Sequence, residues 1–109
     1  MAQFDVHRNK GMRSKSVPFI VVVQSSQFDR YRRRVVVPLV RRSLLSKNTP
    51  TAGSRMNPVF SISGIAVILH PLDTVSVELD HLGEYVDSLA AQGQIICDAM
   101  DELLTRSWG

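Results

Sequence analysis

The densest group of chemically capable side chains in this sequence is a run of arginines around one tyrosine. It comprises Arg30, Tyr31, Arg32, Arg33 and Arg34. Guanidinium groups neutralise phosphates and an aromatic ring stacks on a base, so the run is compatible with binding to RNA. An arginine run between strands is more often a solvated turn, and the same charges would also attract an acidic protein. The run by itself leaves these alternatives open.

Other residues with catalytic or metal-binding potential lack the neighbours that such chemistry needs. The three histidines have no second histidine, cysteine or carboxylate at metal-ligand spacing, and no serine stands in a nucleophile elbow. The sequence contains neither GxGxxG nor a Walker lysine loop. We therefore expect no catalytic residue, no metal and no cofactor, and a protein that binds a partner rather than an enzyme. The residues concerned are His7, His70, His81, Ser25, Ser26, Ser61 and Ser63.

Charge is distributed unevenly along the chain. The net charge is +3, from 13 basic and 10 acidic residues. Basic residues crowd the middle, where Arg41 and Arg42 follow the arginine run, and acidic residues load the C-terminal third. This asymmetry predicts a basic surface that meets an acidic partner, either protein or nucleic acid. The acidic group is Asp80, Glu84, Asp87, Asp98, Asp101 and Glu102.

Length and composition predict one globular domain over residues 1–109. With 44% hydrophobic and 21% charged residues, the chain can bury enough apolar surface to offset the entropy of ordering. The N-terminal residues are too polar for a secretory signal, and no apolar run approaches the length that spans a bilayer. The single cysteine, Cys97, is expected to be a semi-buried thiol on a helix and fits a reducing compartment. We therefore expect a cytoplasmic protein without a membrane partner.

The elements that must position these residues are short strands over the first two thirds of the chain. Alternating or β-branched runs predict strands at 4–7, 19–23, 35–37, 59–62, 65–69 and 75–77. Glycines and prolines, among them Pro38 and Gly64, fall at or near the predicted strand ends. The segment 46–57 is the best candidate for a long loop. Short strands at this spacing predict a compact antiparallel sheet or small barrel.

An amphipathic helix is predicted from about Ala91 to Arg106. Its apolar positions recur at helical spacing and form one broad buried stripe. Because the stripe is wider than a small sheet needs, we expect the side with Met100, Leu103 and Leu104 to pack at a dimer twofold axis. Trp108 follows the helix and either folds back on the sheet or binds a partner, where tryptophan is a frequent hot-spot residue. The stripe is Ile95, Ile96, Ala99, Met100, Leu103 and Leu104.

Several segments, taken together, resemble the CcdB family of bacterial toxins. The most specific part is Val23-Gln24-Ser25-Ser26-Gln27-Phe28-Asp29 followed by Arg33-Arg34-Val35-Val36-Val37-Pro38-Leu39. Farther along are Asn57-Pro58-Val59-Phe60-Ser61-Ile62, then Glu84-Tyr85-Val86, and finally Trp108-Gly109. These segments keep the family's order over nearly the whole chain, which argues against coincidence.

The resemblance implies a homodimer of a small SH3-like antiparallel barrel with a C-terminal α-helix, a fold that the family shares with the MazF ribonucleases. CcdB proteins bind the A subunit of DNA gyrase and hold the enzyme on cleaved DNA, so that religation fails. A CcdA-like antitoxin with a disordered acidic segment binds the toxin and reverses the poisoning. The resemblance thus implies a gyrase poison of a toxin–antitoxin system, without sequence-specific contact to nucleic acid.

Carried over residue by residue, the family's gyrase contacts fall in three parts of this chain. They are Trp108 and Gly109 at the C-terminus, Asp101 and Leu104 on the helix, and Gln27 and Phe28 after the QS motif. Gln27 is polar where the family has an apolar residue, and Trp108 stands three residues farther along than the family's tryptophan, about one helical turn outward. The acidic antitoxin implies contacts at Arg30, Arg32 and Arg33.

Two alternatives to gyrase poisoning stay open. The arginine and tyrosine run favours a MazF-like RNA-binding or ribonuclease toxin. The departures at Gln27 and Trp108 are compatible with a CcdB-fold protein that has lost toxicity. Incubation with RNA, and separately with gyrase and supercoiled plasmid, distinguishes the two toxins, whereas normal growth on overexpression of a folded dimer marks the third case.

Overall fold

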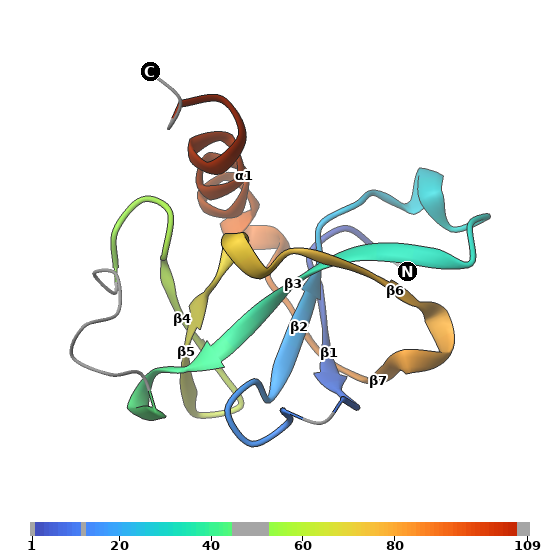
Figure 1. The fold of residues 1–109 in the computed structure, drawn as a ribbon, viewed down its shortest axis with the longest axis horizontal. Helices are drawn as coiled ribbons and strands as arrows, with labels where there is room; N and C mark the ends of the chain where they lie inside the picture. The colour runs from blue at the N-terminus through green and yellow to red at the C-terminus, as the bar shows by residue number, and fades with distance from the viewer. Residues whose placement is uncertain (1, 12, 45–52, 107–109) are drawn as a thin grey trace.

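A computed structural model describes residues 2–11, 13–44 and 53–106 of the chain. In this part of the protein, seven antiparallel strands precede one C-terminal helix (Figure 1). The strands are β1 (Asp5–Asn9), β2 (Phe19–Val22), β3 (Arg33–Arg41), β4 (Val59–Ile62), β5 (Ile65–Leu69), β6 (Val75–Glu78) and β7 (Leu82–Ser88), and the helix is α1 (Gly93–Asp101). The predicted fold class, mainly β with a C-terminal helix, is confirmed.

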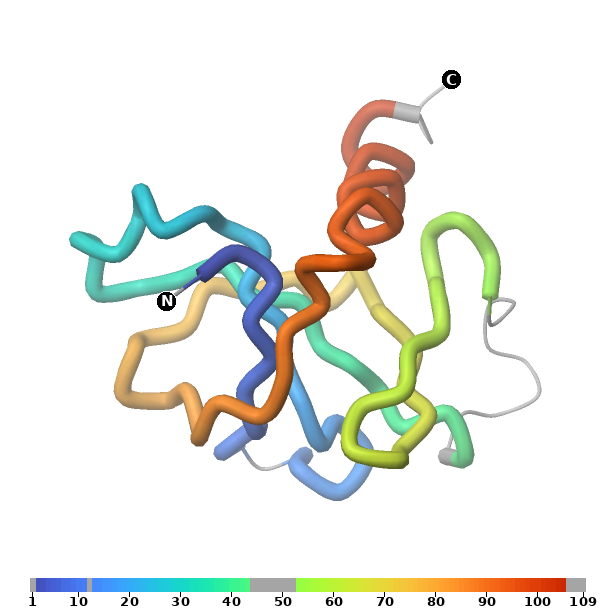
Figure 2. Tube along the Cα trace, turned by 180° about the vertical axis from the view of Figure 1, so that it is seen from behind, coloured from blue at the N-terminus to red at the C-terminus, as the bar shows by residue number. Residues whose placement is uncertain are grey.

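One continuous sheet curls into a half-barrel, seen from both sides in Figures 1 and 2. Its strand order is β4-β5-β3-β2-β1-β7, and β6 also pairs with β3. Ser63 and Gly64 join β4 to β5 with φ values of 50° and 79°, the two positive values that a type I′ hairpin turn requires. The sequence pattern does not predict β7, because Leu82 is the one buried residue on it.

Strand β3 changes partner along one edge, and Pro38 lies at the change. Its first residues pair with β6 and its last three with β5. The expectation that Pro38 marks a strand end is wrong, since β3 continues through it to Arg41. The Pro38 carbonyl accepts a hydrogen bond from the His70 N–H at 3.1 Å, so its nitrogen points to the same edge. A residue without N–H is tolerated there because no neighbouring strand needs its donor.

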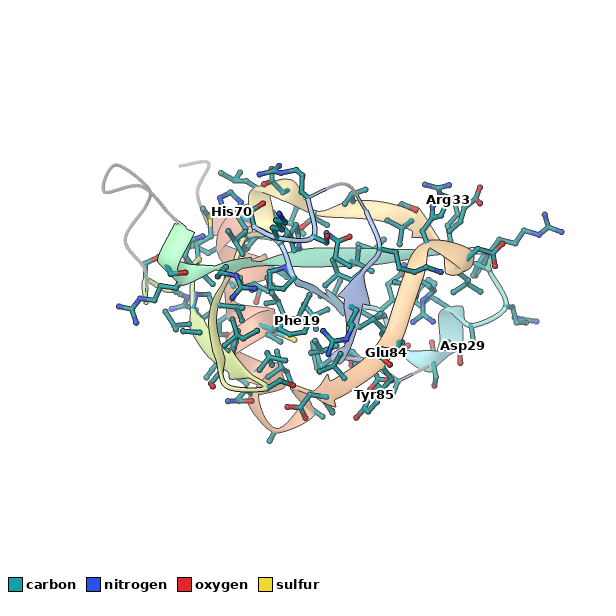
Figure 3. All side chains as sticks on the ribbon, turned by 90° about the horizontal axis from the view of Figure 1, so that it is seen from below. Phe19, Asp29, Arg33, His70, Glu84 and Tyr85 are labelled. Atoms are coloured by element: carbon teal, nitrogen blue, oxygen red, sulfur yellow. The ribbon has the colours of Figure 1, made fainter. Side chains whose placement is uncertain are left out.

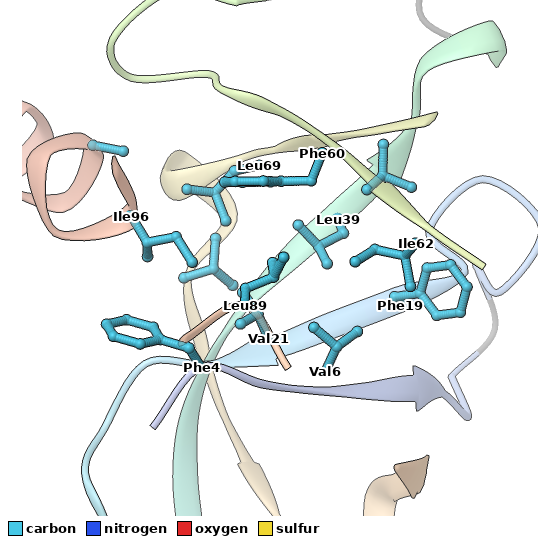
Figure 4. Close-up of a cluster of buried hydrophobic side chains, with 13 residues drawn as sticks. Phe4, Val6, Phe19, Val21, Leu39, Phe60, Ile62, Leu69, Leu89 and Ile96 are labelled. Carbon is cyan, nitrogen blue, oxygen red and sulfur yellow. The ribbon is translucent and has the colours of Figure 1, made fainter. Parts of the chain in front are cut away.

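The sheet is buried on both faces. The main core contains side chains from the strands and from α1, and Figure 4 shows the strand residues together with Ile96 of the helix. A smaller cluster on the opposite face contains Ile20, Val22, Val36 and Leu82. The main cluster is Phe4, Val6, Phe19, Val21, Val37, Leu39, Phe60, Ile62, Val67, Leu69, Leu89, Ile96 and Ala99.

Helix α1 begins where Gly93 meets the aromatic ring of Phe4. A Cβ built on Gly93 would lie 2.5 Å from Phe4 Cε2, so only glycine fits this approach without a shift of the ring. The helix continues beyond Asp101 as a π-helical turn over Glu102–Arg106, close to the predicted end. Cys97 lies on α1 and is exposed rather than semi-buried. Within the described residues, no helix is long and apolar enough to cross a membrane.

The predicted loop at 46–57 lies largely outside the described residues. In its described part, the Gly53 N–H donates to the Asn57 carbonyl at 2.9 Å. The buried Asn57 amide donates in turn to the Leu69 carbonyl at 3.2 Å. These bonds fix the chain directly before β4.

Candidate partner-binding site

Residues 23–32 connect β2 to β3 at one end of the molecule. We call this segment the β2–β3 loop. A 3-10 helix at Ser26–Phe28 is closed by hydrogen bonds from the Phe28 and Asp29 N–H groups to the Ser25 and Ser26 carbonyls, at 3.1 and 3.0 Å. The Tyr31 N–H then donates to the Phe28 carbonyl at 3.1 Å. These local bonds give the loop a defined shape.

A buried arginine holds the loop from inside. Arg34 is 1% exposed, and its side chain makes an ion pair with Asp29. Its Nη2 donates to the carbonyls of Gln24 and Ser25 at 2.9 and 3.0 Å. A guanidinium group has five donors in a planar fork, so one side chain can bridge both ends of a turn. Arg34 therefore braces the loop and is not part of the basic surface that the arginine run predicts.

Two aromatic rings project from the braced loop. The rings of Phe28 and Tyr31 lie 6.0 Å apart between centroids, inclined at 35°. Phe28 is 40% exposed and Tyr31 is 60% exposed. Rigid, solvent-facing aromatic side chains are the kind that dominate binding energy in protein interfaces. The sequence marks Phe28 as a contact through the family resemblance, whereas its pairing with Tyr31 follows only from the turn geometry.

The predicted antitoxin-binding arginines differ in how available they are. Arg33 donates to the Ser76 hydroxyl at 2.9 Å, and its Nη1 lies 3.6 Å from Glu78 Oε1, so its charge is shared with β6. Figure 3 shows Arg33 and Asp29 at the same end of the molecule. Arg30 and Arg32 are exposed and make no ion pair within the described part of the chain. The accessible positive charge of the loop therefore comes mainly from Arg30 and Arg32.

Helix α1 carries a second exposed apolar surface. Ile96 and Ala99 are buried against the sheet, whereas Met100 and Leu103 are half-buried. Ile95 is exposed and Leu104 is 69% exposed, so the predicted stripe is wider than the sheet covers. The predicted gyrase contact Asp101 is exposed beside it.

A single chain does not bring all predicted gyrase contacts into one patch. Gln27 and Phe28 lie on the β2–β3 loop, and Asp101 and Leu104 lie near the end of the helix. Figures 1 and 2 show these two segments projecting separately, with a gap between them in both views. Trp108 and Gly109 lie outside the described residues.

His7 and His70 lie in different parts of the structure. His7 Nδ1 lies 3.0 Å from the Gly83 carbonyl oxygen, and its ring meets Tyr85 edge to face. His70 Nδ1 lies 3.3 Å from Asp73 Oδ2. Over the described ranges, no three histidine, cysteine or acidic side chains come together in a way that could hold a metal ion.

Comparison with known proteins gives a family and a fold. The family model described as CcdB protein matches residues 3–106. Among solved structures, the fold is similar to that of an endoribonuclease in complex with its cognate antitoxin from a mycobacterial species, with a TM-score of 0.73 and 15% identity. That match covers 100% of this chain and 99% of the other. The comparison with curated proteins found no match.

Proposed function

The chain belongs to the CcdB family, and from this premise we propose that it is the toxin of a toxin–antitoxin system that binds the A subunit of DNA gyrase. As a homodimer it would hold gyrase on cleaved DNA. The observation that carries the proposal is the Phe28 and Tyr31 pair, exposed on a loop that the buried Arg34 fixes in place. Phe28 is one of the gyrase contacts that the family resemblance implies, and Tyr31 is its neighbour in the structure.

A braced aromatic pair suits a protein that traps one state of its target. Trapping needs only a higher affinity for that state than for the others, and no reactive group. Aromatic rings that are ordered before binding lose little conformational entropy on contact. The hydrogen bonds from Arg34 to the carbonyls of Gln24 and Ser25 hold the backbone of the loop that carries these rings.

A twofold axis would combine the separated contacts. Leu104 is exposed near the end of the helix of one protomer, and the association of two copies would bury an apolar side chain of this kind. Met100 and Leu103 border the same face. The dimer then presents two copies each of the β2–β3 loop and of the chain segment that carries Trp108 and Gly109.

The accessible arginines support an acidic antitoxin as the second partner. Arg30 and Arg32 flank Tyr31 in sequence and are exposed. An acidic segment that pairs with them would also cover Phe28. Arg33, already paired with Glu78, would contribute less than the sequence predicts.

Arg30, Tyr31 and Arg32 also favour a second candidate function, an RNA-binding or ribonuclease toxin. Exposed guanidinium groups on both sides of an exposed ring can contact phosphates while the ring stacks on a base. The solved structure with the similar fold is an endoribonuclease, although 15% identity carries only the fold.

One assay separates the two functions. The purified protein is incubated with gyrase from the same cell and supercoiled plasmid, then with detergent and protease, and in parallel with labelled RNA. We expect linear plasmid with the wild-type protein, and much less with Trp108→Ala or Phe28→Ser, because each removes a hot-spot side chain. Tyr85→Ser, which removes an exposed tyrosine elsewhere, is the control. Cleaved RNA without linear plasmid would reject the gyrase proposal.

A further inference from the structure

A groove of about 820 Å³ opens beside the smaller core cluster, and Ile20 and Val36 belong to both. Strands β2 and β3 form its floor. One wall comes from β6 and the turn before it, and the other wall comes from the end of β1 and its connection to β2. None of the lining residues belongs to the β2–β3 loop or to α1. The groove is therefore separate from the candidate partner-binding site.

The strand register makes the floor of the groove and its β6 wall apolar. Val36 is opposite Val75. Ile20 is opposite Pro38, two residues after Val36, so all four side chains lie on one side of the sheet. Val75 is 46% exposed, and Leu72, in the turn before β6, is 63% exposed. Ligand pockets are mostly apolar and use a few polar groups to orient the ligand, so the groove suits a molecule with an apolar body.

The wall opposite β6 carries two cations. The ammonium group of Lys10 donates to the Asp80 carbonyl at 3.2 Å, which uses one of its three donors. Within the described residues, neither Lys10 nor Arg13 makes an ion pair. The acidic residue of the lining, Asp73, lies with its Oδ2 3.3 Å from His70 Nδ1. The side chains of Lys10 and Arg13 are therefore available to an anionic group.

The charged and apolar parts of the groove follow the direction of β6. Asp80, which accepts the bond from Lys10, lies in the 3-10 turn after β6, whereas Leu72 and Asp73 lie in the turn before it. An anionic head beside Lys10 is thus at the end of the groove away from Asp73, and its apolar body extends along β6 toward Leu72. A strand of four residues is about 13 Å long, which suits an extended chain of about ten carbons.

We propose that this groove binds a small amphipathic anion, a single aliphatic chain with a carboxylate or phosphate head. The chain lies on Ile20 and Val36 and against Val75, and the head meets Lys10 and Arg13. The ligand is a free molecule rather than part of a bilayer, because its chain occupies the groove. The proposal goes beyond gyrase binding and shares no residue with it, so the outcome of the plasmid assay does not bear on it.

The test is a titration of the full-length, isotope-labelled protein with decanoate at neutral pH, followed by nuclear magnetic resonance. We expect amide shifts at residues 9–11 and 75–77 and a Kd below about 1 mM, an affinity within reach of the method. Octanoate should bind at least about fivefold more weakly, because each methylene group that the groove buries strengthens binding by up to about fourfold. Decyl phosphate is titrated in parallel, and the tighter of the two ten-carbon ligands identifies the preferred head.

Two variants test the charged wall and the apolar wall separately. Lys10→Glu combined with Arg13→Glu should weaken decanoate binding at least about tenfold, since two attractions become repulsions. Leu72→Ser should also weaken it, because Leu72 is an exposed side chain of the lining whose loss does not open the core. Lys15→Glu, an exposed lysine of the same connection outside the groove, is the matched control, and thermal unfolding verifies that each variant folds.

Five results would overturn the proposal. They are the absence of shifts at about 1 mM decanoate, shifts confined to the β2–β3 loop or α1, equal affinities for octanoate and decanoate, equal binding of decyltrimethylammonium, and equal loss of binding in Lys15→Glu. A further titration uses vesicles that contain phosphatidylglycerol. Shifts in the groove with the vesicles but not with decanoate would assign this surface to a membrane instead.

Discussion

The β2–β3 loop and helix α1 both present apolar side chains to solvent, but different forces hold them. The loop depends on hydrogen bonds from one buried guanidinium group to two carbonyls. The helix depends on apolar contacts of Ile96 and Ala99 with the main core. A polar brace fixes the shape of one loop, whereas apolar packing stabilises the whole domain. The two surfaces should therefore respond differently to substitution.

We expect the largest loss of stability for Ile96→Ala, which tests the apolar packing of the helix. Ile96 is fully buried in the main core, and removal of its methyl and methylene groups leaves a cavity. We expect the free energy of unfolding to fall by about 3 kcal/mol, measured by urea denaturation. Ile95→Ala, one residue earlier and exposed, is the control and should cost less than about 1 kcal/mol. Equal losses would show that the helix does not pack as described.

Arg34→Met tests the polar brace and is expected to cost about 2 kcal/mol of unfolding free energy, because two partly buried carbonyls lose their donors. Asp29 is half exposed and can be hydrated, so the loss stays below that of a fully buried ion pair. Hydrogen exchange should accelerate at the amides of Phe28 and Tyr31. Arg33→Met, which removes an exposed arginine, should leave that exchange unchanged. Uniform acceleration over all strands would contradict a local brace.

Gly93→Ala tests the close contact at the start of α1. The added Cβ would lie 2.5 Å from the Phe4 ring, so the ring or the helix must shift. We expect a loss of about 1.5 kcal/mol in the free energy of unfolding. Phe4→Leu in the same chain should recover part of that loss, because a smaller side chain makes room. A double variant whose losses simply add would show that the two residues do not touch.

Sequence analysis predicted the strands whose residues are strongly buried. The apolar run Phe19–Val22 is buried throughout, and the apolar run Ile65–Leu69 is buried over its last three residues. The sequence does not predict β7, because its mostly exposed residues show no alternation of apolar and polar side chains. The full length of β3 was not predicted either, because a proline such as Pro38 normally ends a strand. The pairing of strands in the folded protein determines the presence of β7 and the length of β3.

Sequence analysis identified the candidate site only in part, for a similar reason. Composition marks Arg34 as one of six arginines in a basic surface, yet the period-two alternation of β3 puts it on the same face of the sheet as the buried Val36. That alternation is the signal that could have identified Arg34 as buried. The ring pair of Phe28 and Tyr31 depends on the turn conformation, which side-chain types alone do not determine.

The smallest effect on stability, and the sharpest contrast with Ile96→Ala, is expected for Tyr31→Ser. Tyr31 is 60% exposed and Tyr85 on β7 is 56% exposed, so Tyr85→Ser is a matched control. We expect both variants to change the free energy of unfolding by about 0.5 kcal/mol or less. Binding to the gyrase A subunit, measured by calorimetry, should weaken about tenfold in Tyr31→Ser alone, because only this ring belongs to the exposed pair on the braced loop. If Tyr31→Ser destabilised the loop as much as Arg34→Met does, the ring pair would be part of the brace. The residues that stabilise this loop would then not be distinct from the residues that it offers to a partner.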